Sequence, residues 1–217
     1  MAGKEKKNRT PLTPEDRKRR AAARRTIAGT AAGAAVVGAV PIPIADSALL
    51  VPLQLHMLTR IAKIYGMEKN STENAVIDNI IKVGATTMAG RTVLSALKKV
   101  PGIHLAATVL NALVAGTVTY AAGEISALVF EGIQRGTIDP KTVDWARHIE
   151  TMYREKMPQY TQVLEEAMEK HSGEDVLKNL AKILGRKEKK DDSGMQGNAG
   201  GDHQDTQGSA PDSGTWV

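Results

Sequence analysis

The sequence predicts an all-α fold, and three observations support this prediction. No segment alternates apolar and polar residues in the way that a half-buried strand does. Several segments instead repeat apolar residues every three or four positions, which is the spacing of an amphipathic helix. Small residues also recur four positions apart, and this spacing allows two helices to approach closely. We therefore expect helical hairpins packed through small residues, namely Gly29, Gly33, Gly38, Ala112, Gly116 and Gly123.

The first helix is expected to begin at Thr13. A capping Thr followed by Pro14 and two acidic residues is typical of a helix start. This helix runs through a cluster of arginines into residues 27–45, which contain no charged residue. We expect it to end near Val40.

A turn and a second helix should follow. Pro41 and Pro43 cannot continue a helix, and Asp46 offers a cap for the next one. The second helix should extend to Tyr65 and stop at Gly66, since glycine is common just after a helix. We expect Pro41, Pro43 and Asp46 to form the turn of a helical hairpin.

Two long helices are predicted next. The third should begin at Ser71 and continue to the residue before Pro101. The fourth should run from Ile103 to about Ile133, and its first part, residues 103–123, again contains no charged residue. Glu124 follows directly and is the one acidic residue that could be awkwardly buried, although a salt bridge or a position on the helix surface would explain it more simply.

The C-terminal part predicts shorter helices and a tail. Asp139, followed by a proline, should cap a fifth helix, and Pro158 should separate it from a sixth. A seventh should begin at Ser172 and end near Gly185. Residues 186–217 are rich in Gly, Asp, Gln and Ser, a composition that cannot bury enough apolar surface to fold.

Four segments are therefore expected. Residues 1–12 form a disordered basic arm. Residues 13–136 form a helical core with two uncharged, hairpin-forming stretches. Residues 137–185 form amphipathic C-terminal helices, and residues 186–217 form a disordered tail.

The positive charge is concentrated near the N-terminus. Residues 1–25 contain ten Lys and Arg against three acidic residues, whereas residues 26–185 contain 15 of each. A basic arm can bind anionic lipid, nucleic acid or an acidic protein. Nucleic acid is disfavoured, because the chain has one Phe, two Trp and four Tyr to stack on bases. The cations expected to contact lipid are Arg17, Lys18, Arg19, Arg20, Arg24 and Arg25.

The two uncharged stretches permit two interpretations. A straight helix needs about 20 apolar residues to cross a bilayer, so the first stretch is too short for two spans. The first hairpin could still dip into one leaflet with both ends on the cytoplasmic side, and the second stretch is long enough to span. Alternatively, both stretches form the interior of a soluble bundle. The spacing of small residues predicts close packing in either solvent.

No segment predicts catalytic chemistry. The chain has no cysteine, and its five histidines lack the spacing of metal ligands. A phosphate-binding Gly-rich loop and a Gly-x-Ser-x-Gly elbow are also absent from the sequence. We therefore expect no catalytic residues, no cofactor and no metal.

The chain ends in Thr215-Trp216-Val217. A hydroxyl two residues before a C-terminal Val suits a groove that captures a carboxylate by β-augmentation, as PDZ domains do. Three residues make a short motif, and we treat them as a candidate ligand only.

The sequence resembles a known bacterial family of helical domains. The residues that carry the resemblance are Pro41-Ile42-Pro43-Ile44-Ala45-Asp46, Leu53-Gln54, Met57, Ile61-Ala62, Tyr65-Gly66, Pro101-Gly102 and Thr119-Tyr120-Ala121-Ala122-Gly123. The family is the domain of unknown function numbered 697, often found C-terminal to Era-like or dynamin-like GTPase domains. The resemblance covers about residues 22–135. It implies a helical module that couples a nucleotide switch to a membrane or an assembly, with the GTPase supplied here by a partner.

We expect a non-enzymatic, membrane-associated helical module or adaptor at the cytoplasmic face of a bacterial inner membrane. Its expected partners are anionic membrane lipid and a protein, for which a GTPase is one candidate. A homo-oligomer is also open. The alternative is a soluble, cytoplasmic helical bundle that binds an acidic protein partner.

Overall fold

The computed structural model describes residues 12–40, 46–67, 71–85, 88–100 and 105–185, and within them every regular element is an α-helix. The helices all lie in the compact unit that ends at Gly185. The predictions for residues 1–11, for the turn at Pro41 and Pro43, and for the tail after Gly185 lie outside the described residues. The helices are α1 (Pro14–Gly38), α2 (Asp46–Ile64), α3 (Ser71–Ala85), α4 (Met88–Leu97), α5 (Ala107–Gln134), α6 (Trp145–Met168), α7 (Gly173–Lys178) and α8 (Leu180–Leu184).

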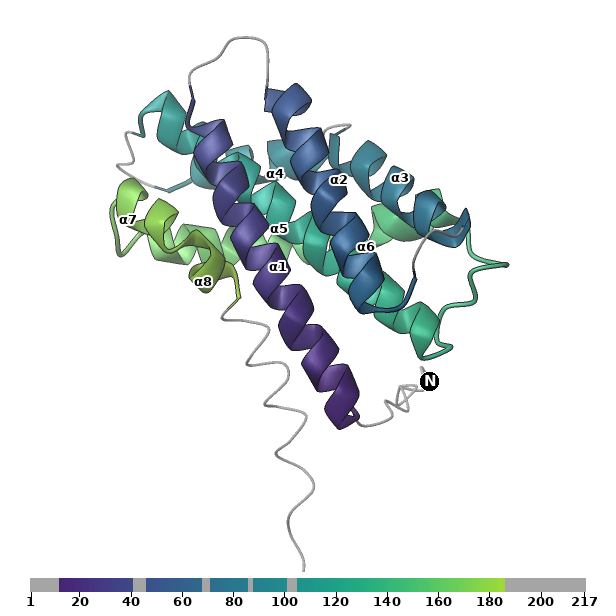
Figure 1. Cartoon of the computed structure of the whole chain (residues 1–217). Coiled ribbons are helices and arrows are strands. Elements are labelled where there is room, and N and C mark those ends of the chain that lie inside the picture. Colours follow the sequence, from purple (N-terminus) through teal and green to yellow (C-terminus); the bar gives the residue numbers. More distant parts are fainter. Residues whose placement is uncertain (1–11, 41–45, 68–70, 86–87, 101–104, 186–217) are drawn as a thin grey trace, which may run out of the picture. The chain divides into compact units, whose positions relative to one another are not determined.

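Helix α5 is the centre of the fold. It contacts each of the other seven helices, and its most extensive contact is with α1 (Figure 1). Leu113, Ile125 and Phe130 point into the core from α5 and are fully buried. In Figure 1, α1 and α2 lie side by side in front of α5, and α6 lies behind it. The other helices therefore pack around one apolar helix.

The start of α1 and the end of α2 lie where local sequence signals predict. The Thr13 hydroxyl accepts a hydrogen bond from the backbone N–H of Asp16, and the Asp16 carboxylate accepts one from the Thr13 N–H, at 3.1 and 3.0 Å. This capping box satisfies two amide groups that a helix start leaves free. At the end of α2, Gly66 has a φ of +71°, a conformation that glycine adopts without steric cost.

The predicted third helix is described in two parts, α3 to Ala85 and α4 from Met88 to Leu97. Residues 86–87 between them lie outside the described residues, so the prediction of one continuous helix is not tested there. The next helix, α5, begins at Ala107 rather than at Ile103, since Ala106 is extended with ψ at 142°.

The boundary predicted at Pro158 is also wrong, because α6 continues through it. Pro158 is exposed, while Tyr153, Met157 and Leu164 on the inner side are buried. Tertiary packing on both sides of the proline therefore offsets the missing backbone hydrogen bond.

The cap of α6 is Asp144, whose carboxylate accepts a hydrogen bond from the Arg147 N–H at 3.2 Å. Asp139 instead accepts one from the Lys141 N–H at 2.9 Å and forms a turn. The final helical segment begins at Ser172 as predicted, but it is divided at Asn179 into α7 and α8.

At three glycines, helices α1 and α5 lie so close that a side chain would not fit between them. A Cβ built on Gly38 would lie 2.8 Å from the Ala115 Cβ and 2.9 Å from the Asn111 backbone oxygen. One on Gly123 would lie 2.7 Å from Ile27 Cγ1. The third is Gly116, where a Cβ would lie 3.1 Å from a backbone oxygen of α1. The small residues therefore bring together α1 and α5, two helices far apart in the sequence.

Two of the other predicted small residues pack differently. Gly33 has only Leu53 Cδ2 of α2 within reach, at 3.9 Å, so the α1–α2 hairpin is looser at this level. Gly29 is exposed, and a Cβ there would meet nothing within 4 Å. Gly29 thus does not make the predicted helix contact, because it lies on the side of α1 that faces away from α5. Ala112 is fully buried opposite Gly38.

This contrast leads to a prediction about two identical substitutions in one helix. Gly38→Ala should lower the free energy of unfolding by about 1–3 kcal/mol, because a methyl group has no space against α5. Gly29→Ala should raise it by about 0.5–1 kcal/mol, since alanine is the better helix former in open space. Urea denaturation of both variants measures the difference. Equal effects would show that α1 and α5 do not pack as closely as described here.

Candidate functional site

The exposed large apolar side chains of the described residues all belong to the hairpin formed by α1 and α2. They are Val36, Val40 and Leu55, with 70, 43 and 45% of their surface exposed. Val36 lies on α1, Val40 follows the end of α1, and Leu55 lies on α2. Three further small or apolar residues of the two helices are exposed, and we call the whole set the hairpin face: Gly29, Ala32, Val36, Val40, Pro52 and Leu55. Two uncharged polar residues of α2, His56 and Thr59, are exposed as well.

The helical repeat explains why these side chains are outside. Ile27, Ala31 and Ala34 are fully buried on one side of α1, so residues two positions from them lie on the opposite side. In a water-exposed helix that side normally carries charged residues. Here residues 26–40 contain none. α1 is apolar on its outer side as well as on its inner side.

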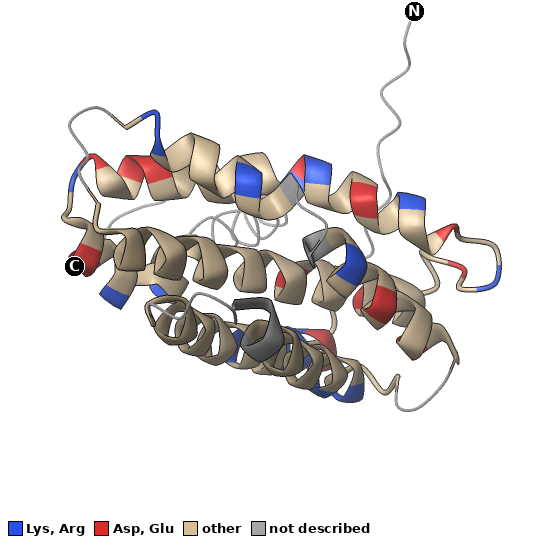
Figure 2. Cartoon of the chain, turned by 90° about the horizontal axis from the view of Figure 1, so that it is seen from above, with Lys and Arg blue, Asp and Glu red and all other residues tan. Residues whose placement is uncertain are grey.

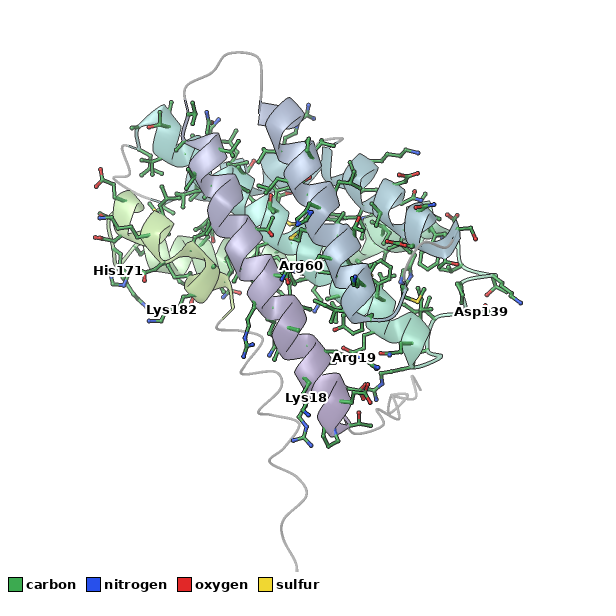
Figure 3. The ribbon with its side chains drawn as sticks, in the orientation of Figure 1. Lys18, Arg19, Arg60, Asp139, His171 and Lys182 are labelled. Atoms are coloured by element: carbon green, nitrogen blue, oxygen red, sulfur yellow. The ribbon has the colours of Figure 1, made fainter. Side chains whose placement is uncertain are left out.

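Charged residues occupy the other half of the hairpin. Residues 26–40 and residues 47–59 contain no Lys, Arg, Asp or Glu, and each segment corresponds to about 20 Å of helix. Lys18 and Arg19 lie near the start of α1, and Arg60 lies beyond the uncharged part of α2 (Figure 3). Along α6, by contrast, basic and acidic residues are intermixed (Figure 2). The hairpin therefore has an uncharged, largely apolar half and a basic half.

The structure separates the six predicted lipid-contacting cations. Arg17, Lys18 and Arg25 are exposed. Arg19 forms a surface ion pair with Glu15 at 2.6 Å. The other two, Arg20 and Arg24, are only partly exposed.

Arg20 faces the core rather than a lipid surface. Its Nε and Nη2 atoms donate hydrogen bonds to the two carboxylate oxygens of Glu131 on α5, at 2.6 and 2.7 Å. The side chains of Arg20 and Glu131 are 22 and 9% exposed. Arg135 also approaches Glu131, at 3.4 Å. The paired geometry is the strong form of a carboxylate–guanidinium contact. Arg20 therefore joins α1 to α5 and is not the free cation that the predicted lipid contact assumed.

Tyr65 lies beside this ion pair at the end of α2. It is 3% exposed, and its hydroxyl has no hydrogen-bond partner among the described residues. Burial raises the pKa of Tyr65 well above its ordinary value, and the negative charges of Glu131 and Glu124 raise it further, against the opposing effect of Arg20 and Arg24. The base of the hairpin therefore holds a buried charged cluster, made of Arg20, Arg24, Tyr65, Glu124 and Glu131.

Sequence reasoning identified one acidic residue of this cluster and missed the other. Glu124 is 8% exposed, so it is buried and does not lie on the helix surface, which was one of the two simpler explanations for it. Glu131 follows it by seven residues, or two helical turns on the same side of α5. That spacing was the signal available in the sequence, although it does not reveal that the partner is on α1.

Other predicted residues lie outside the described part of the chain. Asp46 begins α2, but the positions of its side-chain atoms are not described. Pro41, Pro43 and Thr215-Trp216-Val217 fall in undescribed segments. Within the described ranges, no group of three or more His, Asp or Glu residues could hold a metal ion.

Helix α5 is long and apolar enough to cross a membrane. Its mean hydropathy over the most apolar 18 residues is 1.5, but 89% of that window is buried inside the fold. A buried core helix satisfies the same criteria, so this property alone is weak evidence for a membrane span.

These features define an all-α domain that surrounds a buried apolar helix and exposes an apolar hairpin face. The chain belongs to the family described as Domain of unknown function (DUF697), whose model matches residues 13–172. This match begins at the cap of α1 and includes α6, so it is longer than the resemblance read from the sequence. No curated protein and no solved structure matched the chain.

The Arg20–Glu131 pair leads to a second prediction. Arg20→Ala should lower the free energy of unfolding by about 1.5–3 kcal/mol, because it leaves the Glu131 carboxylate buried with weaker neutralisation. Arg19→Ala is the matched control and should cost less than about 0.5 kcal/mol, since its pair with Glu15 is on the surface. Thermal and urea unfolding test both variants. The structural assignment fails if the two losses are the same.

The third prediction concerns pH. Because the pKa of Tyr65 is raised in the folded state, its contribution to stability is complete below about pH 10, the ordinary pKa, and is lost as the pH rises towards the folded value. Tyr65→Phe should be at least as stable as the wild type at neutral pH, because it removes a hydroxyl without a partner. It should also lose less stability above about pH 10. Urea midpoints measured across this range test it, and a loss identical to that of the wild type would refute it.

Proposed function

We propose that this domain is a non-enzymatic helical module that attaches peripherally to a membrane through the hairpin face. The observation that carries the proposal is the location of the exposed large apolar side chains, Val36, Val40 and Leu55, on one hairpin. Exposed apolar patches on otherwise polar surfaces mark sites that bind proteins or membranes. The separation of the hairpin into an apolar and a basic half favours a membrane.

The expected attachment is modest and reversible. Complete burial of a Val or Leu side chain is worth about 1.5–3 kcal/mol, so these partly exposed residues should each contribute roughly 1–2 kcal/mol. A contribution of this size supports binding at the interface and falls short of the stability of a membrane-spanning helix.

The burial of α5 also favours peripheral attachment. As a span on its own, α5 would bring Glu124 and Glu131 towards the bilayer without the arginines of α1 beside them. Carboxylates within a bilayer are costly unless they are paired. We propose that α5 stays inside the bundle while α1 and α2 meet the lipid.

The proposed location is the cytoplasmic face of a bacterial inner membrane, and the proposed protein partner is a GTPase. The latter rests on the resemblance to a family often found beside GTPase domains. In the alternative, a soluble adaptor, the basic residues of α1 would bind an acidic protein and the hairpin face would remain in water or meet that protein.

Flotation with phospholipid vesicles tests the proposal. The wild type should float with the vesicles, and Val36→Asp should weaken its binding by roughly tenfold, because it puts a carboxylate on the hairpin face. Val36 is 70% exposed, so the variant should fold normally, which circular dichroism checks. Ala146→Asp adds the same charge at an exposed position of α6 and should float like the wild type. A wild type that stays with the soluble fraction would favour the adaptor.

A further inference from the structure

We propose that Arg25 and Arg60 together recognise the phosphate of anionic phospholipid headgroups. The inference rests on the proposed function and identifies the lipid class that the same surface selects. Arg25 lies on α1 and Arg60 on α2, and both side chains are exposed.

The register of the hairpin places these two residues at the same level. Gly33 and Leu53 mark one level, because a Cβ on Gly33 would lie 3.9 Å from Leu53 Cδ2. Arg25 precedes Gly33 by eight residues and Arg60 follows Leu53 by seven, so they lie about 12 and about 10 Å below that level. Ile27 on α1 and Met57 on α2 support the register, since both would touch a Cβ built on Gly123.

Arg25 and Arg60 are also the first cations after the apolar half. On α1 no charged residue lies between Arg25 and Val40, and on α2 none lies from residue 47 to residue 59. When the hairpin face contacts the acyl region, both guanidinium groups therefore reach the depth of the headgroup phosphates. Long basic side chains adopt this position at membrane interfaces by extending towards the polar layer.

No acidic residue of the described chain is paired with Arg25 or Arg60. Within the described chain neither Arg25 nor Arg60 forms an ion pair. Their helical neighbours three and four positions away are apolar, small or basic in each case. Arg20, by comparison, is bound to Glu131. A guanidinium group that lacks an internal carboxylate is suited to a phosphate, which it can bind through two parallel hydrogen bonds.

The chemistry selects a lipid rather than another polyanion. Nucleic acid would also attract Arg25 and Arg60, but it has no apolar medium to cover Val36 and Leu55 farther along the hairpin. An acidic protein would have to present an apolar patch beside its carboxylates, whereas a bilayer has acyl chains next to every headgroup. An anionic phospholipid supplies both a phosphate for the two cations and acyl chains for the hairpin face.

The test compares the full-length chain on vesicles of phosphatidylcholine alone and of phosphatidylcholine mixed with phosphatidylglycerol. The wild type should bind the anionic vesicles at least tenfold more tightly, since each cation near an anionic surface adds roughly fivefold. The double variant Arg25→Gln with Arg60→Gln should lose most of this preference and keep most of its binding to phosphatidylcholine. The reason is that choline compensates the phosphate of phosphatidylcholine, whereas the phosphate of phosphatidylglycerol is left free to attract the two cations. The matched control, Arg17→Gln with Lys18→Gln, removes the same charge farther along α1 and should lose less than about threefold.

The outcomes separate this inference from the proposed function. Binding of the wild type to both vesicle types without preference would overturn the role of Arg25 and Arg60 and leave the hairpin face as an attachment site. Equal losses in the two double variants would also overturn it, because net charge alone would then explain the preference. Absence of binding to either vesicle would contradict the proposed function as well.

Discussion

The close contact between α1 and α5 is the constraint on which the rest of the structure depends. Gly38 and Gly123 allow the two helices to approach, and the Arg20–Glu131 pair joins them at the other end of α1. Close packing without voids favours the contact through dispersion, and the ion pair adds geometric specificity. Because this contact fixes the rotation of α1 about its axis, it also decides which side of α1 faces outward. Val36 is exposed for that reason.

The functional proposal follows from what this packing leaves uncovered. Helix α5 is mostly buried, yet Val36 on α1 and Leu55 on α2 stay exposed. The charged residues that could solubilise this hairpin are instead gathered at its base, where Arg20 neutralises Glu131 and Arg25 stays exposed. A helix pair with an apolar half and a basic half is suited to the boundary between acyl chains and headgroups.

Local signals in the sequence were sufficient for the fold class and for several helix ends. Thr13 begins α1 and Gly66 terminates α2, because capping depends on residues within one turn. The continuation of α6 through Pro158 and the pairing of Arg20 with Glu131, which lies 111 residues away, depend on tertiary contacts. The uncharged stretches were recognised from the sequence, but the buried and exposed sides of α1 were not, since residues 26–40 carry no charge on any side of the helix.

The most direct test of the account uses the absence of cysteine from the chain. A single cysteine can be introduced in turn at Val36, at Leu55 and at Ala146, and labelled with an environment-sensitive fluorophore. On addition of anionic vesicles, the account predicts a blue-shifted, brighter emission at positions 36 and 55 and no change at position 146 on α6. The same emission at all three positions, or a change at position 146 alone, would contradict the claim that the hairpin face is the surface that meets the membrane.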